Sequence, residues 1–188
     1  MKTIKHLITA LLLLCATVAT AHDFEVDGIY YNITDEASST VGVTYQGSSY
    51  GECSNEYIDC VLIPESVIYN SITYSVTSIG ESAFRGCSGL TSIVICNCVT
   101  SIGNYAFYDC TSLKDLRIED GDSILSLGVN KKGYQDYYTS SMGEGLFCDC
   151  PLETLYIGRN LSYNATFSYG YSPFRYTSTL NSITISNN

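Results

Sequence analysis

Residues 77–95 read TSIGESAFRGCSGLTSIVI, and residues 100–118 read TSIGNYAFYDCTSLKDLRI. The two stretches carry the same Thr, Ser, Ile, Gly, Ala, Phe, Cys and Leu residues, always 23 positions apart. A fixed period of this length is typical of repeat proteins, in which each repeat is one structural unit stacked on the next. The sequence therefore predicts a solenoid before any local structure is assigned.

Each repeat continues into an L-x-x-L-x-L frame of apolar residues. Side chains alternate along an extended segment, so the last two apolar residues of a frame face one side and the residue between them faces the other. Stacking such strands in parallel buries one continuous core. The frames are Leu90, Ile93 and Ile95; Leu113, Leu116 and Ile118; Leu152, Leu155 and Ile157; Leu180, Ile183 and Ile185; and an imperfect first copy, Ile58, Val61 and Ile63.

The stretch VTSIGESAFRGCSGLTSI, residues 76–93, resembles the BspA-type leucine-rich repeat of bacterial surface proteins. The resemblance covers residues 58–188 and is specific, because two full repeats match at every signature position. It implies an α/β or mostly β solenoid with a right-handed coil, short parallel strands and about four coils. Residues 22–57 resemble the N-terminal β-rich cap of such proteins. The family further implies secreted or surface-displayed binding proteins and supplies no catalytic residues.

Residues 1–21 have the pattern of a secretory signal peptide. Lys2 and Lys5 precede a leucine-rich apolar run, and small residues end the segment just before His22. The run is too short to span a bilayer comfortably, so we expect cleavage before His22, with no membrane insertion afterwards.

Removal of residues 1–21 leaves 7 basic and 19 acidic residues, a formal charge of −12. This balance argues against a nucleic-acid partner and against docking on an anionic membrane, because both need a basic face. His22 is the only histidine that remains, which disfavours a thiol nucleophile and most hydrolases. We therefore predict that the protein is not an enzyme and uses no cofactor.

The repeat pattern is interrupted before Phe147 by an insertion at residues 129–145, and a smaller insertion precedes Phe174. The last frame ends at Ile185 without a recognisable cap. An uncapped coil exposes a strand edge and half a core. We expect either a longer repeat array or an open C-terminal edge that pairs with another chain.

Eight cysteines remain after cleavage, and export permits disulfides. Cys87, Cys110 and Cys150 share one repeat position, so we expect an internal column of small apolar side chains. Their spacing also permits a bridge between neighbouring coils, whereas the family resemblance suggests free buried thiols. Cys53 and Cys60 flank a short loop and are predicted to form a disulfide.

Two groups of residues have the chemistry of metal ligands, but the sequence predicts a metal site at neither. Cys96-Asn97-Cys98 and Cys148-Asp149-Cys150 could together supply four thiolates to zinc, but Cys150 belongs to the column and the spacers are short. A disulfide of Cys96 or Cys98 is the better expectation. The acidic turn at residues 119–122 does not have the spacing of an EF-hand loop, which favours a solvated turn.

Two groups of side chains are candidates for partner binding. Tyrosine gives rigid contact area with a polar tip, although these rings could simply cover the coils. The outward strand positions form a second surface, the usual place for a protein partner on a solenoid. The tyrosines in the insertions are Tyr134, Tyr137, Tyr138, Tyr169 and Tyr171; the outward strand residues include Asp115, Arg117 and Tyr156.

These patterns together predict a secreted or cell-surface, non-enzymatic binding or adhesion protein that recognises a macromolecular partner through its repeat surface. The partner class is a host or neighbouring-cell protein or a glycan. Two alternatives stay open: a carbohydrate-binding surface protein, and a structural segment of a larger surface protein.

Overall fold

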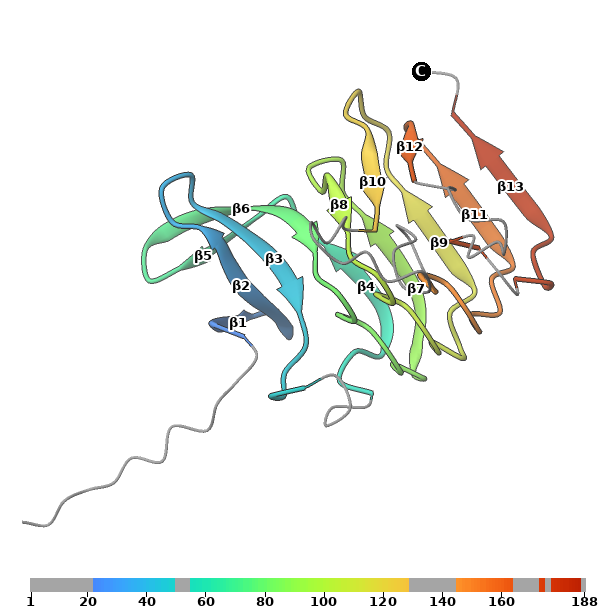
Figure 1. Ribbon diagram of the computed structural model, residues 1–188, viewed down its shortest axis with the longest axis horizontal. Helices are drawn as coiled ribbons and strands as arrows, with labels where there is room; N and C mark the ends of the chain where they lie inside the picture. The colour runs from blue at the N-terminus through green and yellow to red at the C-terminus, as the bar shows by residue number, and fades with distance from the viewer. Residues whose placement is uncertain (1–21, 50–54, 129–144, 164–172, 175–176, 187–188) are drawn as a thin grey trace, which may run out of the picture.

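The computed structural model describes residues 22–49, 55–128, 145–163, 173–174 and 177–186, and these contain thirteen strands, β1–β13, and no helix. No helix in these ranges could cross a membrane. From β4 onward the chain passes alternately between two sheets (Figure 1). Of the two predicted forms of the solenoid, the described residues therefore adopt the mostly β one.

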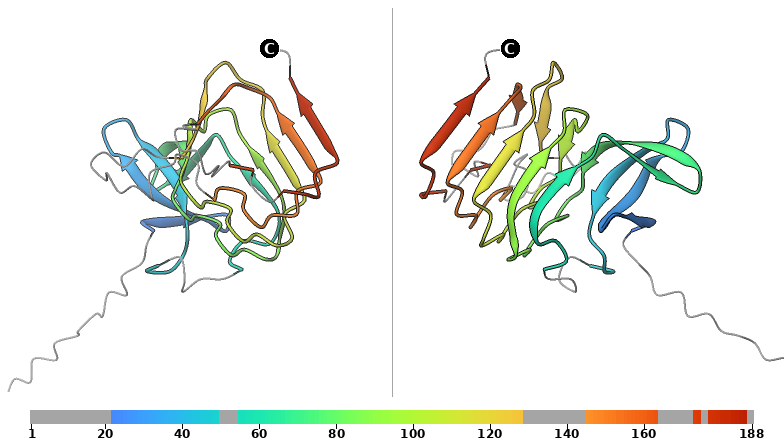
Figure 2. Two further views of the ribbon diagram at one scale, coloured as in Figure 1. Left: turned by 45° about the vertical axis from the view of Figure 1, so that its right-hand side comes forward. Right: turned by 180° about the vertical axis from the view of Figure 1, so that it is seen from behind.

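The repeat frames build the first sheet, which has five strands in the order β13-β11-β9-β7-β4. All neighbouring strands are parallel and in register, with one irregularity at the start of β4. Figure 2 shows the strands stacked side by side, with β13 at the far end from the N-terminal hairpin. The strands are β4 (Asp59–Ile63), β7 (Leu90–Ile95), β9 (Asp115–Ile118), β11 (Thr154–Ile157) and β13 (Ser182–Ile185).

The second sheet joins the N-terminal region to the repeats. It runs in the order β1-β2-β3-β6-β8-β10-β12, with β5 paired to β6. The first three strands are antiparallel, but β3 pairs in parallel with β6, so the backbone ladder continues from the N-terminal strands into the repeats. The strands are β1 (Phe24–Val26), β2 (Ile29–Asp35), β3 (Thr40–Thr44), β5 (Ser66–Tyr69), β6 (Ile72–Ile79), β8 (Ser101–Ile102), β10 (Leu125–Leu127) and β12 (Leu161–Ser162).

The apolar frames face the core where a coil lies on both sides. Ile93 and Ile95 of β7 are buried and Val94 between them is partly exposed, as the alternation predicts. The two end frames differ. Ile58 is 57% exposed because it precedes β4 and turns outward, and Ile183 and Ile185 are 57% and 65% exposed because β13 is the edge strand.

A column of stacked aromatic rings runs through the core. The phenylalanines that recur once per coil are nearly parallel, with centroids 5.0–5.1 Å apart. Tyr57 extends the column toward the cap at 4.4 Å from Phe84, and its hydroxyl donates a 2.5 Å hydrogen bond to the carbonyl oxygen of Thr44 in β3. The stacked phenylalanines are Phe84, Phe107, Phe147 and Phe174.

Glycine is required where one coil turns against the next. The amide of Gly103 donates to the carbonyl oxygen of Ile79 at 2.8 Å, and a Cβ on Gly103 would lie 2.4 Å from the backbone nitrogen of Glu81. A Cβ on Gly80 would lie 3.0 Å from the carbonyl oxygen of Val43, a milder contact. The coils therefore stack by backbone contact at this corner.

We predict that Gly103→Ala lowers the free energy of unfolding by about 1–3 kcal/mol, because backbone atoms of the adjacent coil must move. Gly80→Ala should cost less, because only one oxygen has to shift slightly. Urea unfolding followed by circular dichroism measures both values. Equal losses in the two variants would contradict the role assigned to this contact.

The three cysteines of the predicted column, Cys87, Cys110 and Cys150, are free buried thiols. The thiols of Cys110 and Cys150 each donate to a carbonyl oxygen of the preceding coil, on Phe84 and Phe107, at 3.0 Å. Burial raises the pKa of the Cys87 thiol from its ordinary 9.0 to about 11. Contact with Cys150 and burial also raise the pKa of Cys110, so the thiols of Cys87 and Cys110 are protonated at neutral pH.

The raised pKa of Cys87 predicts a pH dependence of stability. The unfolded chain releases this proton near pH 9, whereas the folded chain holds it until about pH 11. The contribution of Cys87 is thus complete below pH 9 and is lost as the pH rises through 11. Unfolding free energies measured from pH 8 to 11 should fall less steeply in Cys87→Ala. An unchanged slope would contradict this burial effect.

Of the other cysteines, Cys60 differs from expectation, whereas Cys96 and Cys98 form the kind of bond that was expected of them. Cys60 is an exposed free thiol, and Cys53 lies outside the described residues, so the structure does not contain the predicted Cys53–Cys60 bridge. The expected disulfide of Cys96 or Cys98 joins these two residues to each other, and their Cα atoms lie 5.4 Å apart across a tight turn. This bond removes two of the four thiolates that a zinc site would need.

Candidate binding surface

The outer face of the parallel sheet carries two rows of side chains that are set by strand register. In one row Ser92, Asp115, Thr154 and Ser182 are register partners, and in the other Val94, Arg117, Tyr156 and Thr184 are. The outward positions predicted from the frames therefore align across four strands. Cys60 and Leu62 of β4 extend the two rows by one place.

Arg117, Tyr156 and Asp120 form the centre of this face. The Arg117 guanidinium lies 3.9 Å from the centroid of the Tyr156 ring. The Tyr156 hydroxyl donates to the Asp120 carboxylate at 2.8 Å, and Arg117 lies 3.7 Å from the same carboxylate. A guanidinium over an aromatic face is worth about 0.5–1 kcal/mol at exposed sites. The three side chains therefore contact one another on this face.

A second set of contacts joins the same two strands. The Thr154 hydroxyl donates to the Asp115 carboxylate, and Lys114 forms an ion pair with Glu153 at 2.8 Å. Lys114 and Glu153 were not selected from the sequence, although each directly follows the first leucine of its frame. Their shared repeat position is the signal that could have identified them, because register places such residues side by side.

The electrostatics of the face follow from these contacts. Hydrogen bonds from Ser186 and Tyr156 hold the pKa of the Asp120 carboxyl below its ordinary value. The hydrogen bond to Glu153 raises the pKa of Lys114. Both groups thus stay charged at neutral pH. The face presents paired charges around a tyrosine rather than a field of one sign.

Arg159 is a buried cation that sequence reasoning missed. Its guanidinium donates to the carbonyl oxygens of Asn97 at 2.6 Å and Cys96 at 3.0 Å, and to the Ser123 hydroxyl at 3.2 Å. Burial lowers its pKa. Arg159 therefore links the disulfide turn to Ser123, which directly follows the acidic turn at residues 119–122. No sequence pattern identifies an arginine that binds backbone carbonyl groups of distant turns.

The candidate tyrosines of the two insertions lie outside the described residues. They are Tyr134, Tyr137, Tyr138, Tyr169 and Tyr171, and the predicted signal peptide and all of the insertion except Gly145 lie outside the described residues as well. Asp115, Arg117 and Tyr156 are brought together as described above. Among the described residues no group of three or more His, Cys, Asp or Glu side chains could hold a metal ion.

Comparison with family models decides the repeat type. Residues 57–131 match the BspA type leucine rich repeat region, in six copies. The repeats within residues 57–131 are BspA-type leucine-rich repeats. This agrees with the resemblance carried by residues 76–93. A search of curated proteins gives no match to this chain.

Solved structures share the fold. A leucine-rich repeat protein from Bacteroides ovatus is 26% identical, with a TM-score of 0.51 over 87% of this chain and 41% of its own. One from Bacteroides capillosus is 19% identical, with a TM-score of 0.53 over 87% of this chain and 97% of its own. A leucine rich cell surface protein from Faecalibacterium prausnitzii is 20% identical, with a TM-score of 0.50 over 87% of this chain. This chain thus spans about two fifths of the first of these proteins.

We predict that Tyr156→Phe raises the pKa of Asp120 toward its ordinary value, because one of two stabilising hydrogen bonds is lost. The carboxylate contributes to stability above its ordinary pKa, and this contribution disappears as the pH falls through the lowered value. Carboxyl titration by NMR measures the shift. Tyr163→Phe, at an exposed tyrosine after β12, should leave Asp120 unchanged; an equal shift there would contradict the assignment.

Proposed function

We propose that this protein is exported to the cell surface and binds a protein partner through the outer face of its parallel sheet. The observation that carries the proposal is the fixed group of Arg117, Tyr156 and Asp120 at the centre of that face. Interfaces draw most of their binding energy from a few tyrosine, tryptophan and arginine residues. Here such residues are held in place before binding, which lowers the entropy cost of association.

Two further observations support this role. The family of the repeats and the surface protein of Faecalibacterium prausnitzii with the same fold favour display outside the cell. The signal-like segment at residues 1–21 agrees with export. Binding needs no catalytic group, in agreement with the expectation from the sequence that the protein is not an enzyme.

A glycan fits this face less well than a protein. Sugar rings stack on open aromatic faces, but one face of the Tyr156 ring is covered by the Arg117 guanidinium at 3.9 Å. The hydroxyl of the same tyrosine is already engaged by Asp120. A protein partner can instead use the ion pairs and ring edges along the two rows.

The test uses the mature chain, residues 22–188, as bait in host extracellular-matrix and mucosal extracts. Captured proteins are identified by mass spectrometry, and the purified hit is then titrated against variants. We expect Tyr156→Ala to weaken binding at least tenfold, as for a hot-spot residue. Tyr163→Ala, which removes an exposed tyrosine outside this sheet, is the matched control and should bind as the parent does.

Three outcomes contradict the proposal. Equal binding of Tyr156→Ala and the parent chain places the site elsewhere. Capture of nothing by a folded bait counts against adhesion. Selective signals on a glycan array that Tyr156→Ala removes would assign the face to carbohydrate instead.

A second candidate is a structural role in a larger surface assembly, favoured by the exposed Ile183 and Ile185 on the edge strand β13. Such an edge can pair with another strand. Light scattering of the mature chain and of a double variant, Ile183→Thr with Ile185→Thr, distinguishes the roles. Self-association that the variant abolishes supports edge pairing, and a monomer at all concentrations counts against pairing between copies.

A further inference from the structure

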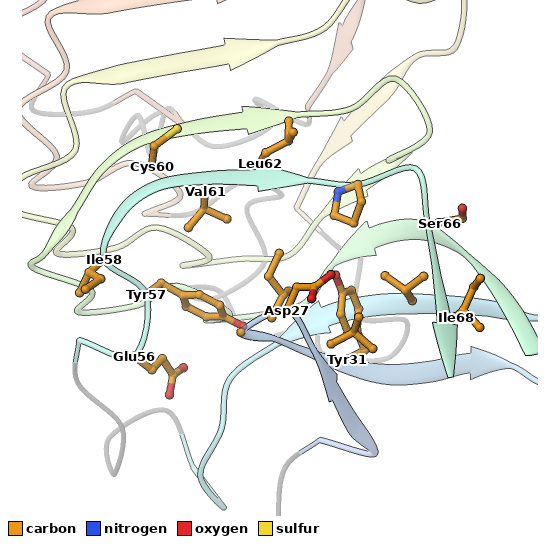
Figure 3. A pocket seen from close by; sticks show the side chains of 15 residues that line it. Asp27, Tyr31, Glu56, Tyr57, Ile58, Cys60, Val61, Leu62, Ser66 and Ile68 are labelled. Carbon is orange, nitrogen blue, oxygen red and sulfur yellow. The ribbon is translucent and has the colours of Figure 1, made fainter. Parts of the chain in front are cut away.

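A pocket of about 660 Å³ lies at the end of the parallel sheet opposite β13. Figure 3 shows it between β4 on one side and the cap residues Asp27 and Tyr31 on the other. Its volume falls within the range of ligand sites, about 300–1,000 Å³. The pocket is separate from the Arg117–Tyr156 group, which lies on β9 and β11, two and three strands away from β4.

One wall of the pocket is an edge strand, paired on one side only. β4 is the terminal strand of its sheet, and Cys60, Val61 and Leu62 line the pocket. An edge strand presents backbone amides and carbonyls that lack a ladder partner, a ready template for another strand. Leu62 is 60% exposed and Ile68 on the pocket rim is 67% exposed. An extended peptide could bond to the edge and cover these apolar side chains.

The opposite wall holds a buried polar atom without a partner. Tyr31 is fully buried, and within the described part of the chain its hydroxyl has no hydrogen-bond partner. Leaving such a group unpaired in the interior costs free energy. The same burial raises the pKa of the Tyr31 hydroxyl, which stays neutral. A ligand in the pocket could form a hydrogen bond with the Tyr31 hydroxyl if the side chains that cover this hydroxyl shifted slightly.

The charge of the pocket selects the chemistry of the occupant. Among the described residues that line the pocket, Asp27 and Glu56 alone carry a charge, so this lining is acidic. Figure 3 shows Asp27 beside Tyr31 and Glu56 near the start of β4. A second copy of this chain is a poor occupant of an acidic pocket, because the chain is itself acidic. Its edge strand β13, with the sequence SITI, also contains no lysine or arginine that could pair with Asp27.

We propose that this pocket binds an extended peptide segment of a partner protein, which adds as a strand to the β4 edge and places a lysine or arginine against Asp27 and the Tyr31 hydroxyl. Backbone bonds along β4 give affinity, and the acidic corner gives selectivity. This site would recognise a segment of a partner independently of the face around Tyr156.

The probe is a capped synthetic peptide of alternating valine and threonine with a lysine at each end, about seven residues long to match a strand. Binding to the mature chain is measured by fluorescence anisotropy. We expect saturable binding that weakens with added salt. A peptide with glutamate in place of both lysines, and one interrupted by proline, should not bind, because the first reverses the charge and the second cannot form the ladder.

Variants of the chain test each wall. Asp27→Asn should weaken binding about tenfold, because a charge-assisted contact is lost. Tyr31→Phe should weaken binding while making the free protein more stable to urea, since it removes an unsatisfied buried hydroxyl. Leu62→Lys should abolish binding by placing a cation on the edge. Ile124→Lys makes the same charge change at an exposed residue away from the pocket and should bind normally.

Several results would overturn the proposal. The proline-interrupted peptide binding as well as the parent peptide would exclude strand addition. Capped lysine alone binding equally tightly would assign the pocket to a small cation. Self-association that Leu62→Lys abolishes would assign the edge to a second copy, and absence of binding to a folded chain would leave the pocket without this role. None of these results depends on Tyr156, so the proposal for the pocket and the proposal for the outer face are tested independently.

Discussion

The spacing of the coils is the constraint on which the rest of the structure depends. Parallel backbone ladders set neighbouring strands about 4.8 Å apart, and the stacked phenylalanine rings at 5.0–5.1 Å fit that spacing closely. The backbone ladders and the ring stacking can both form along the whole column only if successive coils have the same shape. The close approach at Gly103 enforces that shape at the corner, and the buried thiols of the cysteine column fill the space beside the rings.

The same constraint makes the outer face a rigid array. Once the inner side chains lock the register, side chains from residues 39 positions apart, such as Arg117 and Tyr156, become neighbours. Their contacts are exposed, so they add little to stability and are suited to recognition instead. The insertions interrupt the sequence between coils without disturbing this face, because the flanking strands β9 and β11 remain paired in register.

The parallel sheet has two edge strands, β4 and β13, and their surroundings differ. At the N-terminal end, strands β1–β3 extend the second sheet and Tyr57 continues the aromatic column, but β4 of the parallel sheet remains an edge strand. At the other end β13 is uncovered on its inner side, with Ile183 and Ile185 exposed. Both proposed strand-pairing roles follow from this geometry, whereas the face around Tyr156 acts through side chains.

The sequence by itself determined the repeat, the inward and outward alternation, the aromatic column and the buried thiols, because each depends on a fixed period that stacking turns into contact. It also predicted that Asp115, Arg117 and Tyr156 face outward. Only the tertiary structure decided that Cys96 pairs with Cys98, that Arg159 binds the turns of other coils, and that Tyr31 lies unpartnered beside an acidic pocket. These features join segments with no common period, so their contacts depend on how the chain folds between them.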